Sequence, residues 1–447
     1  MSEQDRLQQA IDRLIAAEAD DRDLDVVGEA HPADLAQVLR QRPVEAQVRL
    51  FRTLDPEAAG AVLSELDDDT LLNLVRSLDE EEVSKILDRM PAEEAADVVE
   101  ELPEEHAEKL LELMEEEKSE EVQELLEYPE HSAGRLMSPN LVAVDEDMTV
   151  AQAIDHIRKS VLEERSFELF VTDHHGHLVG AVPLRRLLVA PPDTPIVAIR
   201  NEDVVSVTPE TDQEEVARVV AKYDLAAIPV VDRRHRLLGS ISVADVVDIV
   251  GEEASEDIFG LAGSDAAELE KRSPRQLAML RLPWILATLM LELGAGVVIH
   301  LYDATLGRVI LLASFMPVIQ AISGNTGLQS VTMIVRGLAT GQVTLDRWWE
   351  PLRRQMQASA IIGGVCAVVV GLIGGVWHSP AFGFVVALSM FVSVNLSGLA
   401  GTSFPMISKR LGLDPALTAG PLATTFQDVL GITIFLSLAT ALLHWLV

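Results

Sequence analysis

The last third of the chain consists of apolar segments long enough to cross a lipid bilayer. After residue 281 there are five of them: 282–301, 309–335, 358–378, 381–405 and 417–446. About 20 apolar residues in a helix span the hydrocarbon core of a membrane. Helices are also one of the few structures that satisfy every backbone hydrogen bond there. The sequence therefore predicts a membrane domain of five α-helices over residues 282–447.

Basic residues give this domain a predicted orientation. Lys and Arg concentrate in two of the loops between the segments: Arg336, Arg347, Arg353 and Arg354 in one, Lys409 and Arg410 in the other. The opposite connections hold one Arg and no Lys. Because positive charge stays on the cytoplasmic side, we expect a multi-pass protein of the cytoplasmic (inner) membrane. Its N-terminus would lie in the cytosol and its C-terminus outside.

Residues 1–130 are acidic and repetitive. They hold 39 Asp and Glu against 12 Lys and Arg, which argues against a nucleic-acid partner because phosphates need basic side chains. An apolar residue recurs every 12 positions: Leu54, Leu66, Leu78, Met90, Leu102, Met114 and Leu126. Most are followed by an acid or a proline suited to begin a helix. Units this short bury little surface alone, so we predict an all-α superhelical domain in which they stack.

Two runs that resemble each other follow, at 167–188 and 226–247. In each run an apolar strand ends at Asp and Gly follows seven residues later: Asp173 and Gly180, then Asp232 and Gly239. A second strand and a helix complete each copy. A hairpin followed by a helix, occurring twice, predicts tandem α/β modules that pack on each other.

The paired Asp-x6-Gly turns resemble cystathionine-β-synthase-type (CBS) domains. We place the first at 131–198, the second at 199–255 and a connecting (plug) helix at 256–281. The resemblance implies a role in sensing nucleotides or ions, with ATP a candidate ligand. The alternative is a purely structural spacer.

Asp428 lies deep in the last apolar segment, in GPLATTFQDVLG. A carboxylate at bilayer depth costs roughly 2.5 kcal/mol or more, and the five segments contain no Lys or Arg to neutralise it. This favours a function for Asp428. Thr424 lies one helical turn earlier on the same face. Asn325, in the SGNTG stretch of the second segment, offers an amide oxygen.

Carboxylate, amide, hydroxyl and carbonyl oxygens suit a hard cation such as Mg²⁺ or Ca²⁺. One acid is few for a divalent ion, and a dimer would supply two. The small residues of the fourth segment, Gly398 and Gly401 among them, favour helix packing over pore lining. Glu292, in the first segment, either lines a cavity or is protonated, and the sequence leaves both readings open.

Over nearly its full length the chain resembles the MgtE family of magnesium channels. The matching stretches are YPEHSAGRLM, EEASEDIFGLAG, RLPWIL, SGNTGLQS and LGLDPALTAGPLATTFQDVLG. The resemblance implies a homodimer with its pore between the two membrane domains. It implies that Asp428 binds hydrated Mg²⁺, with Asn325, Thr424 and Gly420 beside it.

The resemblance also implies that cytosolic Mg²⁺ closes the pore by binding between the N-terminal domain, the CBS pair and the connecting helix. Candidate ligands for this regulatory Mg²⁺ are Glu93, Asp97, Glu253, Glu256, Asp257 and Asp414. The chain departs from the family pattern SAGGLMT at Arg135 and Ser138. It also has Gln355 and Gln357 where the family often carries a glutamate. These departures bear on gating rather than on the pore.

The function that follows is a Mg²⁺-selective channel or transporter. Two alternatives stay open: a transporter or exporter of Co²⁺ or another divalent ion, and a membrane-bound sensor that transports nothing. An enzyme is not expected, because the sequence has no Ser/His/Asp constellation, no Walker loop and no H-E-x-x-H spacing.

Overall fold

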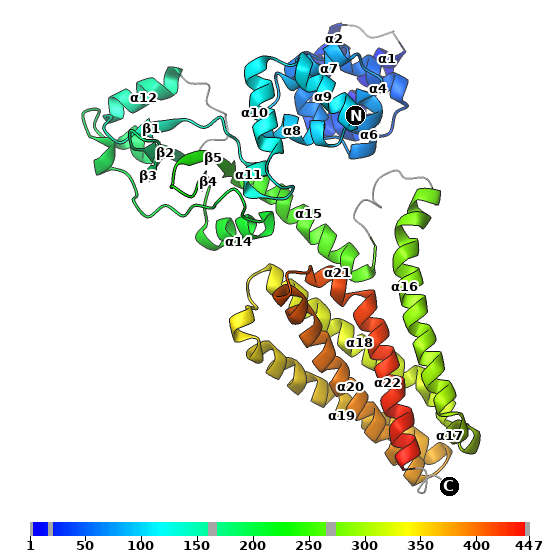
Figure 1. Cartoon of the computed structure of the whole chain (residues 1–447). Helices are drawn as coiled ribbons and strands as arrows, with labels where there is room; N and C mark the ends of the chain where they lie inside the picture. Colours follow the sequence, from blue (N-terminus) through cyan, green and yellow to red (C-terminus); the bar gives the residue numbers. More distant parts are fainter. Residues whose placement is uncertain (1–2, 17–20, 160–167, 265–273, 443–447) are drawn as a thin grey trace. The chain divides into compact units, whose positions relative to one another are not determined.

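The computed structural model describes residues 3–16, 21–159, 168–264 and 274–442, which form two compact units divided between Val250 and Gly251 (Figure 1). We call residues 1–250 the first unit and residues 251–447 the second. The middle of the predicted connecting helix, 265–273, and the end of the last predicted span, 443–447, lie outside the described residues. So does part of the first predicted CBS module, 160–167.

In the acidic region a helix begins every 12 residues. After α1 (Glu3–Ile15) and α2 (Asp21–Gly28) come α3 (Pro32–Leu39), α4 (Val44–Phe51), α5 (Pro56–Leu63), α6 (Asp68–Val75), α7 (Glu80–Leu87), α8 (Ala92–Glu100), α9 (Glu104–Leu113) and α10 (Glu116–Leu126). Asp55 and Asp67 cap α5 and α6 by accepting hydrogen bonds from backbone N–H groups three residues on. The predicted all-α superhelical domain is confirmed.

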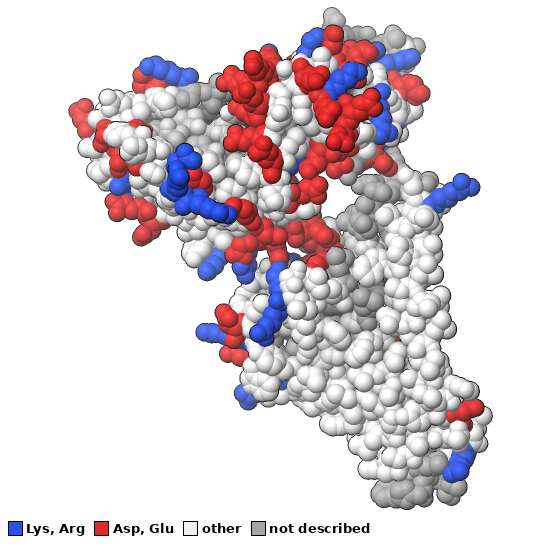
Figure 2. Space-filling model, viewed as in Figure 1, with Lys and Arg blue, Asp and Glu red and all other residues white. Residues whose placement is uncertain are grey.

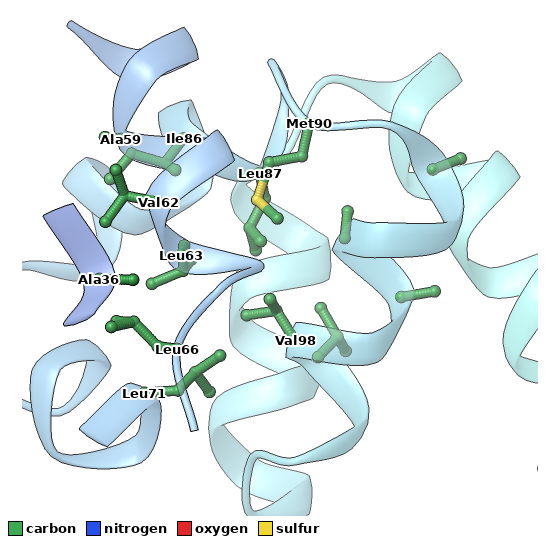
Figure 3. Packing of buried hydrophobic residues seen from close by; sticks show 14 of the residues in the cluster. Ala36, Ala59, Val62, Leu63, Leu66, Leu71, Ile86, Leu87, Met90 and Val98 are labelled. Carbon is green, nitrogen blue, oxygen red and sulfur yellow. The ribbon is translucent and has the colours of Figure 1, made fainter. Parts of the chain in front are cut away.

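The repeat helices stack through their apolar faces. Each packs on the helix two further along: α3 on α5, α5 on α7 and α7 on α9. Figure 3 shows Leu63 of α5 meeting Leu87 and Met90, from the repeat of α7, in one buried cluster. The acidic side chains are left on the outside, where Figure 2 shows them covering these helices. The domain thus buries a shared core that no single repeat has.

Two α/β modules follow the repeats and the short α11 (Ala133–Leu136). The first has β1 (Ala143–Asp145), α12 (Val150–Lys159), β2 (Glu168–Thr172), β3 (Leu178–Pro183), α13 (Leu184–Val189) and a 3₁₀ turn (Ile196–Ala198). The second has α14 (Gln213–Tyr223), β4 (Ala227–Val231), β5 (Leu237–Ser242) and α15 (Val243–Ala262). β2 and β3 are antiparallel, as are β4 and β5, while β1 pairs with β2 in parallel.

The two Asp-x6-Gly turns are explained by backbone contacts. Asp173 accepts hydrogen bonds from the N–H groups of His175 and His177, at 2.8 and 2.9 Å. A further bond from the His177 ring lowers the pKa of Asp173 to about 2. Asp232 makes the same pair of backbone bonds in the second hairpin. A Cβ on Gly239 would come within 2.7 Å of a backbone oxygen in the segment before β1. Each motif therefore fixes a tight hairpin.

The described part of the second unit includes five helices of 21 to 31 residues. They are α16 (Pro274–Leu301), α18 (Leu312–Ala339), α19 (Trp349–Trp377), α20 (Pro380–Arg410) and α22 (Pro421–Ala441). The short α17 (Asp303–Arg308), a 3₁₀ turn (Leu345–Arg347) and α21 (Pro415–Ala419) connect them. Among the described residues, α16, α19, α20 and residues 423–441 are long and apolar enough to cross a membrane. Figure 2 shows an almost uncharged surface over these helices.

The remaining long helix, α18, falls outside this set because polar residues interrupt its apolar sequence. Asn325, Gln329 and Thr332 are exposed within the single chain, and α18 packs on α20 and α22 through its other face, where Ser323, Thr326 and Ser330 are buried. Their hydroxyls donate to carbonyl oxygens of their own helix, three or four residues back. Polar side chains at membrane depth are tolerated where protein surrounds them. The predicted second span is therefore present as a helix, with one face buried against its neighbours and the other exposed within the single chain.

Some predicted segment boundaries differ from the helices. The boundary between the second CBS module and the connecting helix, at 255/256, falls inside α15, which is one continuous helix. The first spanning helix is already helical at Pro274, ahead of the predicted start at 282. The last predicted span, 417–446, is broken at Gly420 and Pro421 into α21 and α22. A proline lacks the N–H that would continue the preceding helix, which accounts for this break.

We predict that Leu87→Ala destabilises the repeat domain much more than Leu113→Ala. Leu87 is fully buried, whereas Leu113 is 44% exposed. Emptying a buried leucine site costs about 2–5 kcal/mol, and an exposed substitution about 0.5 kcal/mol or less. Amide hydrogen exchange of α5, α7 and α9 in the full chain measures the difference. Equal exchange in the two variants would contradict the shared core.

Candidate metal site in the helical bundle

Asp428 lies on α22, about two turns after this helix begins at Pro421. α22 follows the break at Gly420 and packs against α16, α18 and α20. Asp428 is half-buried and faces Gly324 of α18: a Cβ on Gly324 would lie 3.5 Å from its Oδ1. The missing side chain at Gly324 leaves room for the carboxylate beside α18.

A cavity of about 380 Å³ opens between α18 and α22 at this point. It is lined by Pro317, Gln320, Ala321, Gly324, Asn325, Leu328, Thr424 and Asp428. Three residues selected from the sequence, Asp428, Asn325 and Thr424, are thus brought together. They supply a carboxylate, an amide and a hydroxyl, which are oxygen donors suited to a hard cation.

Gln320 is a member of this cavity that the sequence analysis missed. It lies four residues before Gly324 on α18, and hence on the same helix face. Its amide adds a second side-chain oxygen from α18. Helical spacing from Gly324 was the signal that could have identified it.

Gly420, predicted to lie beside the ion, is at the break between α21 and α22. It is absent from the cavity lining, and its carbonyl accepts both the N–H and the hydroxyl of Thr424, at 3.2 and 2.8 Å. A Cβ on Gly420 would lie 2.8 Å from the carbonyl oxygen of Gly260 and 2.9 Å from that of Leu261. Gly420 therefore permits close contact between the ends of α15 and α22.

Glycines bring α18 against its neighbours. A Cβ on Gly401 of α20 would fall on the carbonyl group of Gly327, 3.0 Å from its carbon. On Gly398 it would fall on the side chain of Ser359 in α19. These contacts confirm the packing interpretation of the small residues in the fourth segment. They also fix the position of α18, which supplies one wall of the cavity.

Gln427 is the second residue that the sequence did not single out. Its side chain lies over Gly327 and is 1% exposed. Neither its amide oxygen nor its amide nitrogen has a hydrogen-bond partner. An unpaired buried amide costs about 1–3 kcal/mol. Next to Asp428, it marks the α18–α22 contact as a strained part of the bundle.

The regulatory candidates in the first unit are Glu93 and Asp97, one turn apart on α8. Asp97 Oδ1 pairs with Arg135 Nη2 at 3.2 Å, and the same nitrogen lies 2.6 Å from Glu100 Oε2. Arg135 is 3% exposed. Arg135, which departs from the family pattern, thus places a buried guanidinium against Asp97, a predicted ligand of the regulatory ion. Glu100, a turn after Asp97, was missed, although the same helical spacing indicates it.

The remaining regulatory candidates lie in the second unit. Glu253, Glu256 and Asp257 are spaced on one face of α15. Asp414 begins α21, where its Oδ1 accepts the N–H of Ala416 at 2.8 Å. Helix capping therefore gives Asp414 a structural role as well as its predicted one.

A further acidic group lies in the first CBS module. Asp145, Asp147 and His174 have donor atoms within 4.8 Å of one another. His174 already bridges the two carboxylates, at 3.1 and 3.0 Å, and its side chain is 67% exposed. Asp145 beside it raises the pKa of His174. Because the imidazole links both acids, the group is complete without an ion.

Three family models match separate parts of the chain. A family model described as a divalent cation transporter, MgtE, matches residues 316–438. The model of the MgtE intracellular N domain matches 30–131, and the CBS-domain model matches 133–193 and 196–252.

Similar whole proteins are magnesium transporters. The magnesium transporter MgtE of Thermus thermophilus is 37% identical over 322 residues, 71% of each chain. That of Bacillus subtilis is 34% identical over 319 residues, again 71% of each. A solved cytosolic domain of the Mg²⁺ channel MgtE in complex with ATP is 33% identical, with a TM-score of 0.51, over 55% of this chain and 99% of that one.

We predict that Gly401→Ala destabilises the bundle, whereas Gly364→Ala does not. A methyl group at Gly401 meets the backbone of Gly327, but nothing lies within 4 Å of the corresponding point at Gly364. Overpacking of this kind costs about 1–3 kcal/mol. The thermal stability of the detergent-solubilised variants, followed by size-exclusion chromatography after heating, measures the effect. Equal stability would show that α18 and α20 do not meet at these glycines.

Proposed function

The chain belongs to the MgtE family of divalent cation transporters, and from this premise we propose that it conducts Mg²⁺ across a membrane through a site centred on Asp428. The observation that carries the proposal is the cavity between α18 and α22, where Asp428 lies beside the amides of Gln320 and Asn325. Each is an oxygen donor, and each lies within a bundle of apolar helices. A carboxylate is retained in such a place when it serves an ion pathway.

The size of the cavity suits an ion that keeps its water. Mg²⁺ dehydrates reluctantly and prefers six oxygen ligands. Six waters occupy about 180 Å³ at roughly 30 Å³ each, and the cavity measures about 380 Å³. Asp428 and the amides would therefore bind water molecules of the ion's shell. Selectivity would come from the shape and charge of that shell.

We propose a homodimer whose two Asp428 residues face one pore. A single half-buried carboxylate leaves a divalent ion with net positive charge, and a second chain would neutralise it. Basic loops at Arg336–Arg354 and at Lys409–Arg410 support a cytosolic N-terminus and an external C-terminus in the cytoplasmic membrane.

We propose that cytosolic Mg²⁺ closes this pore by binding the acidic residues of α8 and α15. Facing carboxylates repel, and a divalent ion between them favours the compact state. In this chain Arg135 already pairs with Asp97 and Glu100. A permanent positive charge there takes over part of the role of the ion. Gating by Mg²⁺ is therefore proposed to be weaker at α8 than it would be without Arg135.

The CBS pair is our proposed site for ATP, which is present in the solved relative. The two hairpins join through a cluster of Phe170, Leu178, Ala181 and Val231. Apolar side chains around the cluster remain partly exposed: Leu141, Val204, Ala227 and Leu237. Such a surface fits the flat face of an adenine ring.

Asp428→Asn is expected to reduce Mg²⁺ uptake into proteoliposomes roughly tenfold or more. The substitution keeps the size of the side chain but removes its charge from the ion. Asp303→Asn is the matched control, because it removes an acid at the start of α17. Uptake by D428N at the wild-type rate would refute the assignment. Competition by Co²⁺ in the same assay distinguishes a Mg²⁺ pathway from one for another divalent ion.

Arg135→Ala is expected to make the chain more responsive to Mg²⁺. Removing Arg135 takes the positive charge away from Asp97 and Glu100, which are partly exposed and so remain accessible to an ion. Mg²⁺ that binds the folded state then raises its stability. In thermal unfolding, adding Mg²⁺ should raise the Tm of R135A more than that of Arg233→Ala. The second substitution breaks an exposed ion pair with Glu210. Equal increments would show that Arg135 does not replace an ion.

A further inference from the structure

Glu292 lies near the middle of α16, the first spanning helix. Its side chain is exposed within the single chain, and its carboxyl group is within hydrogen-bonding reach of the carboxyl group of Asp428. α16 lies outside residues 316–438, the part matched by the divalent cation transporter model. The contact therefore involves a residue to which the family match assigns no role.

Hydrogen bonds near the C-terminal ends of α16 and α22 fix how these two helices align, and hence the contact between the two acids. The Tyr302 hydroxyl and Ser437 Oγ lie 2.7 Å apart, and Thr305 Oγ1 lies 2.8 Å from Thr440 Oγ1. The two helices run in the same direction (Figure 1). Glu292 is ten residues before Tyr302, and Asp428 is nine before Ser437. At 1.5 Å per residue the two acids are then level to within about 2 Å.

Apolar packing between these bonds and the two acids keeps the helices together. Ala295, one turn after Glu292, is buried in a cluster that includes Ile432 and Phe435 of α22. Contacts on the C-terminal side of the two acids therefore fix the register of α16 against α22.

Two carboxylates this close inside a bundle repel unless a cation or a shared proton lies between them. Among the described residues, no basic side chain acts on Asp428; the charged group that does is Glu292. The amides of Gln320 and Asn325, in the same cavity as Asp428, offer further oxygens. The surroundings are therefore those of a cation site with two acids from one chain.

We propose that Glu292 is the second carboxylate of the ion site, and that it acts on the hydrated divalent cation together with Asp428. The inference rests on the proposed function, because it adds a residue to the same pathway. In a dimer the site would have four carboxylates rather than two. Glu292 is not among the residues that line the cavity, so in this proposal it acts on the ion from beside Asp428.

The first test compares Mg²⁺ uptake by wild type, Glu292→Gln, Glu292→Asp and the control Asp303→Asn in proteoliposomes. We expect E292Q to raise the Mg²⁺ concentration for half-maximal uptake about tenfold, because one of two attracting charges is lost. E292D keeps the charge and should retain most of the affinity, and D303N should match wild type. An unchanged half-maximal concentration in E292Q would overturn the proposal.

The second test needs no transport. The chain has one cysteine, Cys366, so C366S provides a cysteine-free parent. In that parent, E292C should react with an anionic, water-soluble methanethiosulfonate reagent, and Mg²⁺ should slow the reaction. The control L293C lies one residue further along α16, and Mg²⁺ should leave its reaction unchanged. Adding D428N should abolish the protection of E292C.

The outcomes separate this inference from the proposed function. If wild type carries Mg²⁺ but E292C is unreactive or unprotected, Glu292 lies off the path and only the inference fails. If Mg²⁺ protects E292C through Asp428 but wild type carries none, the ion site stands and transport fails. Protection of E292C that persists in D428N would contradict a shared site.

Discussion

A carboxylate inside a bundle of apolar helices costs roughly 2.5–3.5 kcal/mol, and the arrangement of the second unit follows from how Asp428 is accommodated. α22 can carry this acid because α18 presents Gly324 opposite it and amides beside it. α18 in turn packs on α20 and α22 through one face and leaves Asn325 exposed within the single chain. The polar helix and the buried acid therefore depend on each other.

Close packing holds α18 against these two neighbours. Gly327 touches α20 at Gly401 and α22 at Gln427, so one residue brings three helices together. The amide of Gln427 remains unpaired in this contact, which leaves the junction next to Asp428 under strain. Buried polar groups without a hydrogen-bond partner often occur at functional sites. A shift of α22 relative to α18 would alter both the amide's surroundings and the width of the cavity.

Much of this organisation could be predicted from the sequence. The 12-residue spacing predicted the repeat helices because each repeat has its own start signal. Helical periodicity placed Thr424 and Asp428 on one face, and the cost of a buried charge singled out Asp428. Gly420 could not be interpreted in the same way: its carbonyl is taken by Thr424, and its contact with α15 joins residues about 160 positions apart. The pairing of Arg135 with Asp97 and of Glu292 with Asp428 also depends on contacts between distant segments.

The most direct test of the central claim is to locate the ion. Crystals of the protein grown with Mn²⁺, measured at its absorption edge, would give an anomalous peak for each bound divalent ion. The account predicts a peak in the cavity lined by Asp428, Asn325 and Gln320, at a distance that leaves room for water between metal and carboxylate. A peak elsewhere in the membrane domain, with none at Asp428, would contradict it.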